Sequence, residues 1–171
     1  MEEIIKRVSI REYLNKEVSK EDIEKLLLAG EAAPSAKNQR PWEFIVCDDK
    51  ALLTMISEKC VNHKMAKDAP LAIIVLCNKN KIISPLYTHQ DLSAATENIL
   101  LEATHLGLGS VWLGVAPNEE RMNNLKEIFE LPDDYYAFSI IVIGYPKKEI
   151  IKERKYDSSL VHHNKLNNKY E

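Results

Sequence analysis

Three short polar segments, far apart in the sequence, carry residue types that could hold a charged or flat ligand. The first is Arg7-Val8-Ser9-Ile10-Arg11. In an extended chain, alternate side chains project to the same side, so Arg7, Ser9 and Arg11 would share one face. Guanidinium groups offer paired donors to a phosphate, and a hydroxyl adds a further contact. A solvated strand edge explains the same pattern, and this segment alone favours that simpler interpretation.

The second segment, from Ala33 to Trp42, reads APSAKNQRPW and places two prolines around small and amide residues. Turn-forming Pro, Ser and Asn are typical of an ordinary loop. Binding residues also concentrate in loops that a rigid scaffold supports. The segment is therefore either a plain connection or a rigid loop that presents amide donors and acceptors to a flat heterocycle.

The third segment, from Leu106 to Gly114, reads LGLGSVWLG. It lacks both the GxGxxG pattern and a following GK[ST], which excludes a nucleotide-binding phosphate loop. Gly114 could let the backbone approach a flat ring closely, or it could mark a bulge in a strand.

The helices that must position these segments are indicated by capping residues and apolar spacing. Three of the four expected helices follow a residue that commonly caps a helix N-terminus, and the fourth is expected from about Asp49 to Lys59. The helix from Leu92 to Leu106 is apolar around most of its circumference and ends in Gly107-Leu108-Gly109, where glycines suit a left-handed cap. The three expected caps are Ser19, Asp91 and Asn118.

Apolar runs predict the strands between these helices. Leu71 to Cys77 is an uninterrupted run of apolar residues, which is typical of a central strand buried on both faces. Helix and strand alternate four times, which predicts one α/β or α+β layered structure. The expected strands are Trp42 to Cys47 with one better-buried face, Leu71 to Cys77, Ser110 to Val115, and Ala137 to Ile143.

Length and composition limit the classes of protein. A chain of 171 residues with 45% hydrophobic residues favours one domain, residues 1–171, large enough to need no disulfide or metal. Its formal net charge of −3 gives no reason to expect nucleic-acid binding. No apolar run is long enough to cross a bilayer and no signal peptide is visible, so we expect a cytoplasmic protein with no membrane partner. Three cysteines without CxxC spacing are expected to be reduced: Cys47, Cys60 and Cys77.

The final residues, 147–171, form a basic and polar extension. Five Lys or Arg stand against two Glu between Lys147 and Lys155, and no helical period follows Asp157. Such a tail is either disordered or held against another surface. His162 and His163 would point in opposite directions in an extended chain, so we predict no metal site there.

In combination, these motifs resemble the nitroreductase family of flavoproteins. RxSxR, APSxxNxxPWxF, a D-x-S-x-A-x-x-N helix that runs into GLGxxW, and a closing GYP follow in order from Arg7 to about Asn164. The resemblance implies an α+β fold with a mostly antiparallel central sheet flanked by helices. It also implies a homodimer in which the C-terminal tail reaches the partner, with FMN as cofactor.

The resemblance further implies which residues hold the FMN. The N-terminal segment would contact the phosphate and ribityl chain, the 34–38 loop would lie against the flavin of the other subunit, and the 113–114 backbone would face the ring. A basic tail residue, Lys152 or Arg154, would close on the phosphate. The implied contacts are Arg7, Val8, Ser9, Arg11, Pro34, Ser35, Ala36, Asn38, Leu113, Gly114 and one of these two tail residues.

The flavin would carry the chemistry, which explains why no catalytic set of side chains stands out. The resemblance implies a ping-pong cycle in which NAD(P)H passes a hydride to flavin N5, and a nitroaromatic, quinone or enone then accepts it. Arg11 and Asn38 are candidates to stabilise the reduced flavin. Arg40 stands where the family often has Gln. The alternatives are an FMN carrier or sensor without turnover, and other flavin chemistry such as flavin fragmentation or reductive dehalogenation.

Overall fold

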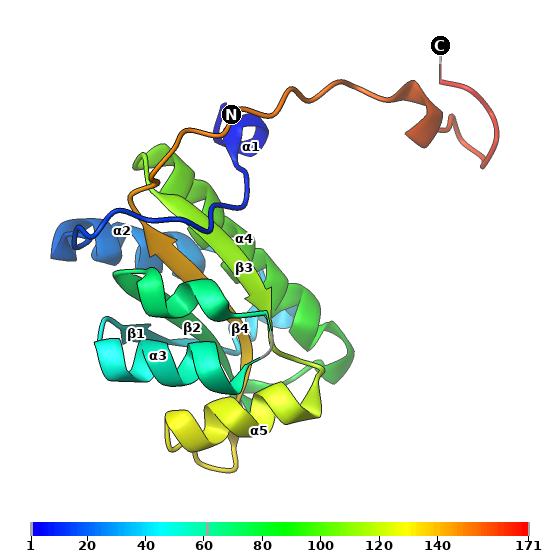
Figure 1. Cartoon of the computed structure of the whole chain (residues 1–171). Coiled ribbons are helices and arrows are strands. Elements are labelled where there is room, and N and C mark those ends of the chain that lie inside the picture. The colour runs from blue at the N-terminus through cyan, green and yellow to red at the C-terminus, as the bar shows by residue number, and fades with distance from the viewer. Residues whose placement is uncertain (1, 61, 171) are drawn as a thin grey trace.

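The computed structural model describes residues 2–60 and 62–170, and the strands among them form one antiparallel sheet (Figure 1). The strand order is β1-β2-β4-β3, and every neighbouring pair is antiparallel. The expected α+β fold with a mostly antiparallel central sheet is therefore confirmed. The strands are β1 (Trp42–Cys47), β2 (Leu71–Asn78), β3 (Gly109–Gly114) and β4 (Tyr135–Gly144).

Helices cover both faces of this sheet, with α2 and α4 on one side and α3 and α5 on the other (Figure 1). Successive residues of β2 enter the two cores alternately, and the whole strand is buried. The prediction of a central strand buried on both faces is confirmed. The helices are α1 (Glu2–Lys6), α2 (Lys20–Glu31), α3 (Lys50–Lys59), α4 (Thr88–His105) and α5 (Glu119–Ile128).

Two of the three expected helix caps are present. Ser19 accepts the backbone N–H of Asp22, and Asn118 accepts that of Arg121. Asp49, near which a helix was expected to begin, caps α3 by accepting two backbone N–H groups. The third expected cap is wrong, because α4 begins at Thr88 and Asp91 lies inside its first turn. The Asp91 side chain accepts hydrogen bonds from a distant loop, and no pattern local to the helix indicates such partners.

The glycines after α4 have different roles. Gly107 adopts φ 72°, and Leu108 N–H donates to the Ala103 carbonyl at 2.8 Å, which closes the helix in a Schellman arrangement. Gly107 is the one glycine among the described residues with positive φ, so it provides the expected left-handed cap and Gly109 does not. Gly109 instead begins β3, one residue before the predicted strand start.

The burial of β1 also differs from the prediction. Trp42 packs into the core under α2 and α4, whereas Cys47 packs into the core under α3 and α5. Both faces of β1 are covered because helices lie on both sides of the sheet, so one better-buried face is not observed. All three cysteines are buried and free.

The C-terminal tail follows the N-terminal segment and then extends away from the sheet and helices (Figure 1). Lys147 N–H donates to the Glu12 carbonyl at 3.0 Å, and Arg154 reaches the backbone near α1. Beyond that point the tail carries apolar side chains that are largely exposed, namely Tyr156, Leu160, Leu166 and Tyr170. No helix built from the described residues has both the length and the apolar character to cross a bilayer.

Candidate functional site

The N-terminal segment lies extended along the start of β3. Ile10 N–H donates to the Ser110 carbonyl at 2.9 Å, and Ser9 forms a parallel bridge with Ser110. Tyr13 donates its hydroxyl to the Ile10 carbonyl at 2.6 Å, and burial raises the pKa of this phenol, so it stays a neutral donor. Val8 and Ile10 pack toward the core.

This arrangement leaves the polar residues of the segment on the outer side. Ser9 and Arg11 are exposed and Arg7 is half-buried, in the alternation expected from the sequence. The Arg7 guanidinium forms an ion pair with Glu97 of α4 at 3.3 Å. Among the described residues, the Arg11 side chain makes no hydrogen bond or ion pair, so its donors are available to an anion.

The tail brings a further cation to the same place. Arg154 donates to the carbonyl of Ile5 at 3.1 Å and to the carbonyl of Arg7 at 2.8 Å. These bonds join Arg154 to the N-terminal segment, although the two are far apart in sequence. Lys152 is exposed and is two residues earlier in the same tail.

A close contact fixes the depth at which the N-terminal segment lies on β3. A Cβ atom at Gly109 would lie 2.7 Å from Ile10 Cγ2 and 2.8 Å from Ile10 Cβ. Only glycine therefore allows Ile10 to pack against the start of this strand.

We expect Gly109→Ala to lower the free energy of unfolding by about 1–3 kcal/mol, the usual cost of overpacking, and to weaken anion binding by displacing the N-terminal segment. Chemical denaturation measures the first effect. Gly114→Ala is the control for stability, because a Cβ at Gly114 meets nothing within 4 Å. Equal denaturation midpoints for Gly109→Ala and wild type would contradict this account of the contact.

The far end of β3 is open. Gly114 is exposed with free space where a side chain would stand, whereas the Leu113 side chain is buried. At Leu113, only the backbone is available to a ligand. Arg121 of α5 donates to the Gly114 carbonyl at 2.8 Å, a contact that sequence reasoning missed. This bond fixes the end of the strand beside the open space.

The loop before β1 has an unusual backbone. Lys37, Asn38 and Arg40 adopt φ of 52°, 53° and 44°, in the left-handed region that non-glycine residues seldom occupy. Ser35 Oγ accepts the Arg40 N–H at 3.0 Å. Strained backbone of this kind is concentrated at binding sites and must be held by its surroundings.

Side-chain hydrogen bonds hold this loop in place. Gln39 and Asp91 are buried polar residues that bond to each other and to the loop, and neither was identified as a site residue from the sequence. The Arg40 guanidinium folds back and donates to the Glu31 carbonyl at 3.1 Å, at the C-terminal end of α2. A cation is favourable there because of the helix dipole.

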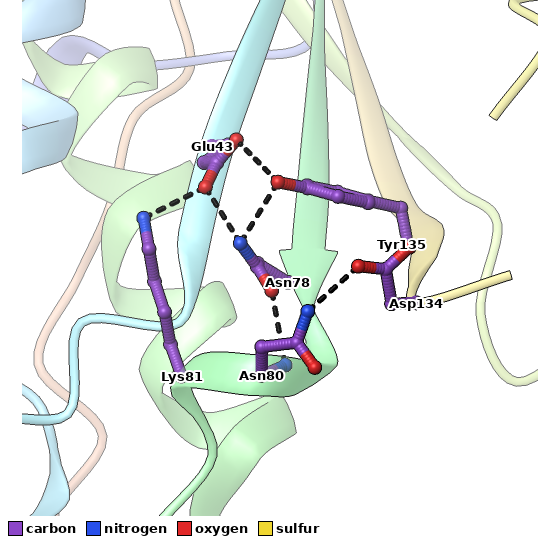
Figure 2. Close-up of polar contacts among 6 residues, drawn as sticks. All are labelled: Glu43, Asn78, Asn80, Lys81, Asp134 and Tyr135. Atoms are coloured by element: carbon purple, nitrogen blue, oxygen red, sulfur yellow. Dashed lines mark hydrogen bonds and ion pairs between the residues drawn. The ribbon is translucent and has the colours of Figure 1, made fainter. Parts of the chain in front are cut away.

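A polar network holds the sheet where the loop enters β1. Figure 2 shows Asn78 donating to both Glu43 and the Tyr135 hydroxyl at 2.8 Å. The Lys81 ammonium, 2.8 Å from Glu43, holds the pKa of that carboxyl below its usual range. Asn78 N–H also donates to the Pro41 carbonyl at 2.8 Å, which ties the end of the loop to this network.

An open groove of about 680 Å³ lies between α2, the loop and β1. The two cations that line it are already partnered, since Arg40 bonds to α2 and Lys81 pairs with Glu43. The lining residues are Leu27, Glu31, Asn38, Gln39, Arg40, Trp42, Glu43, Phe44 and Lys81.

Within one chain, the structure brings together only some of the candidate residues. The Arg7 to Arg11 segment forms a backbone hydrogen bond with Ser110 and accepts a hydrogen bond from Arg154. The 34–40 loop bonds instead to Glu31, Ser84 and Asp91. Across residues 2–60 and 62–170, no hydrogen bond or ion pair joins this loop to the N-terminal segment.

These features indicate an α+β protein in which an antiparallel sheet lies between two pairs of helices and a cationic segment runs along edge strand β3. The model of the nitroreductase family matches residues 4–63 and 56–145. A relative from Archaeoglobus fulgidus, provisionally named NADH dehydrogenase/NAD(P)H nitroreductase, is 48% identical over 87% of this chain and 88% of its own length. The chain belongs to the nitroreductase family.

Solved structures of relatives share this fold. An FMN-dependent nitroreductase from Clostridium difficile superposes with a TM-score of 0.89 at 36% identity, over 97% of this chain and all of its own. A provisionally named nitroreductase from Desulfovibrio desulfuricans, solved in complex with FMN, superposes with a TM-score of 0.82 at 27% identity, over 96% of both chains.

Proposed function

We propose that this protein is an FMN-dependent NAD(P)H oxidoreductase that reduces a small acceptor such as a nitroaromatic, quinone or enone. The observation that carries the proposal is the exposed Ser9 and Arg11 pair, held by β3 on the same strand edge as the open backbone at Gly114. Family membership and FMN-dependent relatives support the same cofactor.

The residues present fit an FMN molecule. Arg7, Ser9 and Arg11 offer charged and hydroxyl donors to one terminal phosphate, with Lys152 or Arg154 as a further cation. The absence of a side chain at Gly114 leaves room for a flat ring. When bound, FMN supplies the hydride chemistry, and the protein binds and orients it.

The side chains of this chain would then hold the cofactor and tune its surroundings. Arg11 and Asn38 are the candidates to place positive charge and amide donors near the ring, where they would stabilise negative charge. We assign no side chain a proton-transfer role.

We also propose that two copies of the chain share each site, with residues 1–171 of each copy forming one domain and residues 147–171 reaching the other copy. The exposed apolar residues of the tail, such as Leu160 and Leu166, would lose contact with water on a partner. The 34–40 loop, which does not meet the N-terminal segment of its own chain, would meet that of the partner. Three free buried cysteines fit the reducing cytoplasm that we propose as its location.

We expect the purified protein to be yellow and to release FMN, not FAD, on denaturation, because its cationic residues suit one terminal phosphate. Absorbance spectroscopy and chromatography of the released flavin measure this. Colourless protein that fails to bind FMN added at about micromolar concentration, where specific cofactors bind, would refute the proposal.

Two further measurements separate this function from its alternatives. Steady-state oxidation of NAD(P)H with a quinone distinguishes an enzyme from an FMN carrier or sensor without turnover. Analysis of the products distinguishes acceptor reduction from flavin fragmentation or reductive dehalogenation.

A further inference from the structure

Two buried polar side chains, Gln39 of the 34–40 loop and Asp91 of α4, bond to each other and to backbone groups around them. Gln39 is 6% exposed and Asp91 is 5% exposed. Asp91 Oδ1 accepts the Ala36 N–H at 2.9 Å, and Asp91 Oδ2 accepts from Gln39 Nε2 at 2.5 Å. Gln39 Oε1 in turn accepts the N–H groups of Ile83 and Ser84 at 2.8 and 2.7 Å.

The direction of each hydrogen bond follows from the backbone. The N–H groups of Ile83 and Ser84 can only donate, so the oxygen of the Gln39 amide must face them. The Gln39 nitrogen then faces Asp91, which accepts at both carboxylate oxygens. The Gln39–Asp91 pair thus joins the loop, the 83–84 turn and the first turn of α4.

This pair offsets the strain of the loop. Three non-glycine residues of the loop adopt the left-handed conformation, which costs free energy. Without the buried bonds, the loop would keep only exposed side-chain contacts, such as those of Arg40 with Ser35 and Glu31. The pair is not required to cap α4, because Asp91 lies inside the first turn and bonds away from the helix. Its bonds run to the loop and to the turn beside it.

We propose that Gln39 and Asp91 are positioning residues that hold the 34–40 loop in the conformation in which it contacts the FMN of a second copy of the chain. This inference rests on the proposed function. Both side chains are buried, so they act through Ser35 and Asn38, which the loop presents at its surface.

The bond pattern provides a sharp test. Asp91→Asn keeps the shape but turns one acceptor into a donor that faces the Gln39 donor. Rotating the Gln39 amide would only move the clash to Ile83 and Ser84. Adding Gln39→Glu provides an acceptor both toward the new amide at position 91 and toward the N–H groups of Ile83 and Ser84. The double variant therefore regains these bonds and the original charge, and it loses only the 3.4 Å bond from Gln39 Nε2 to the Ser84 carbonyl.

We expect Asp91→Asn to weaken FMN binding about tenfold and Asp91→Asn/Gln39→Glu to return it to within about threefold of wild type, as a lost and a restored buried hydrogen bond imply. Gln39→Glu alone places two carboxylates together and should also weaken binding. Asp48→Asn is the control, because it removes one exposed carboxylate at the opposite end of β1. Fluorescence of free flavin in equilibrium with the protein measures affinity.

Subunit mixing separates positioning across the dimer from a general effect on folding. In a mixed dimer of Arg11→Ala and Asp91→Asn chains, an effect of Asp91 on the partner's site leaves one site intact, so activity returns. If Asp91→Asn does not fold, Gln39→Met breaks the same pair without adding a charge and is used in its place.

Wild-type FMN affinity in Asp91→Asn would overturn the inference. So would failure of the folded double variant to recover, or absence of activity after verified subunit exchange with Arg11→Ala. If the wild-type protein binds no FMN, it is the proposed function that fails, and the titration of wild type reveals that separately.

Discussion

Arg11→Ala is expected to weaken FMN binding by about 1.5–3 kcal/mol, which corresponds to about 10–150-fold in the dissociation constant. The Arg11 side chain is exposed and makes no hydrogen bond or ion pair among the described residues, so its donors are free for a phosphate. Its removal leaves no protein partner unsatisfied. The loss of affinity would therefore report the ligand contact itself, with little change in the free energy of unfolding.

Arg7→Ala should weaken FMN binding by a free energy in the same range, but two effects would contribute. Its guanidinium also pairs with Glu97, so truncation both removes a cation and leaves an acidic group beside the site. Because the Arg11 contact is partly exposed, added salt should weaken FMN binding to wild type more than to Arg11→Ala.

Titration of FMN into each variant, followed by flavin fluorescence, measures both effects. Lys20→Ala is the matched control, since it removes one exposed positive charge from α2, away from the N-terminal segment. Unchanged FMN affinity in both Arg7→Ala and Arg11→Ala would show that the phosphate is held elsewhere.

Periodicity and caps predicted most of the fold because those signals are local. Ser19 and Asn118 cap their own helices, and the uninterrupted apolar run of β2 directly indicates a buried strand. Sequence reasoning missed α1, which has no buried residue and is held by contacts such as Glu3 to His105. A five-residue helix without an apolar face leaves no periodic signal.

The candidate site was predictable only in part, for the same physical reason. The alternation of Arg7, Ser9 and Arg11 follows from extended geometry, and the structure shows it. Asp91 was misread as a cap because a carboxylate before an apolar helix fits that role locally. Its actual partners, Ala36 and Gln39, are more than fifty residues away in sequence, and only the folded chain reveals them.

Mixing an Arg11→Ala chain with an Asn38→Ala chain is expected to restore activity that neither variant has alone. If each site combines the N-terminal segment of one copy with the 34–40 loop of the other, a mixed dimer holds one doubly damaged site and one intact site. Equal amounts of both chains at random exchange give half mixed dimers. The mixture should then show about one quarter of wild-type activity, as expected for a two-fold symmetric dimer.

The geometry of the single chain motivates this expectation. The loop and the N-terminal segment share no hydrogen bond or ion pair among the described residues. A shallow groove of about 520 Å³ lies on the α2 and α4 side, where a partner would cover it. Its apolar lining includes Ile4, Ala29 and Leu101. FMN bound between two chains should also stabilise the dimer, so the melting temperature should rise with FMN concentration.

Steady-state NAD(P)H oxidation after subunit exchange measures the recovery, and differently tagged chains verify the exchange. The control mixes Arg11→Ala with the double variant Arg11→Ala/Asn38→Ala, which leaves both sites damaged whether or not they are shared. Recovery in the first mixture alone requires that the loop act on the partner's site. A stable monomer with full FMN and full activity in sedimentation would contradict shared sites, because one chain would then hold every residue that the flavin needs.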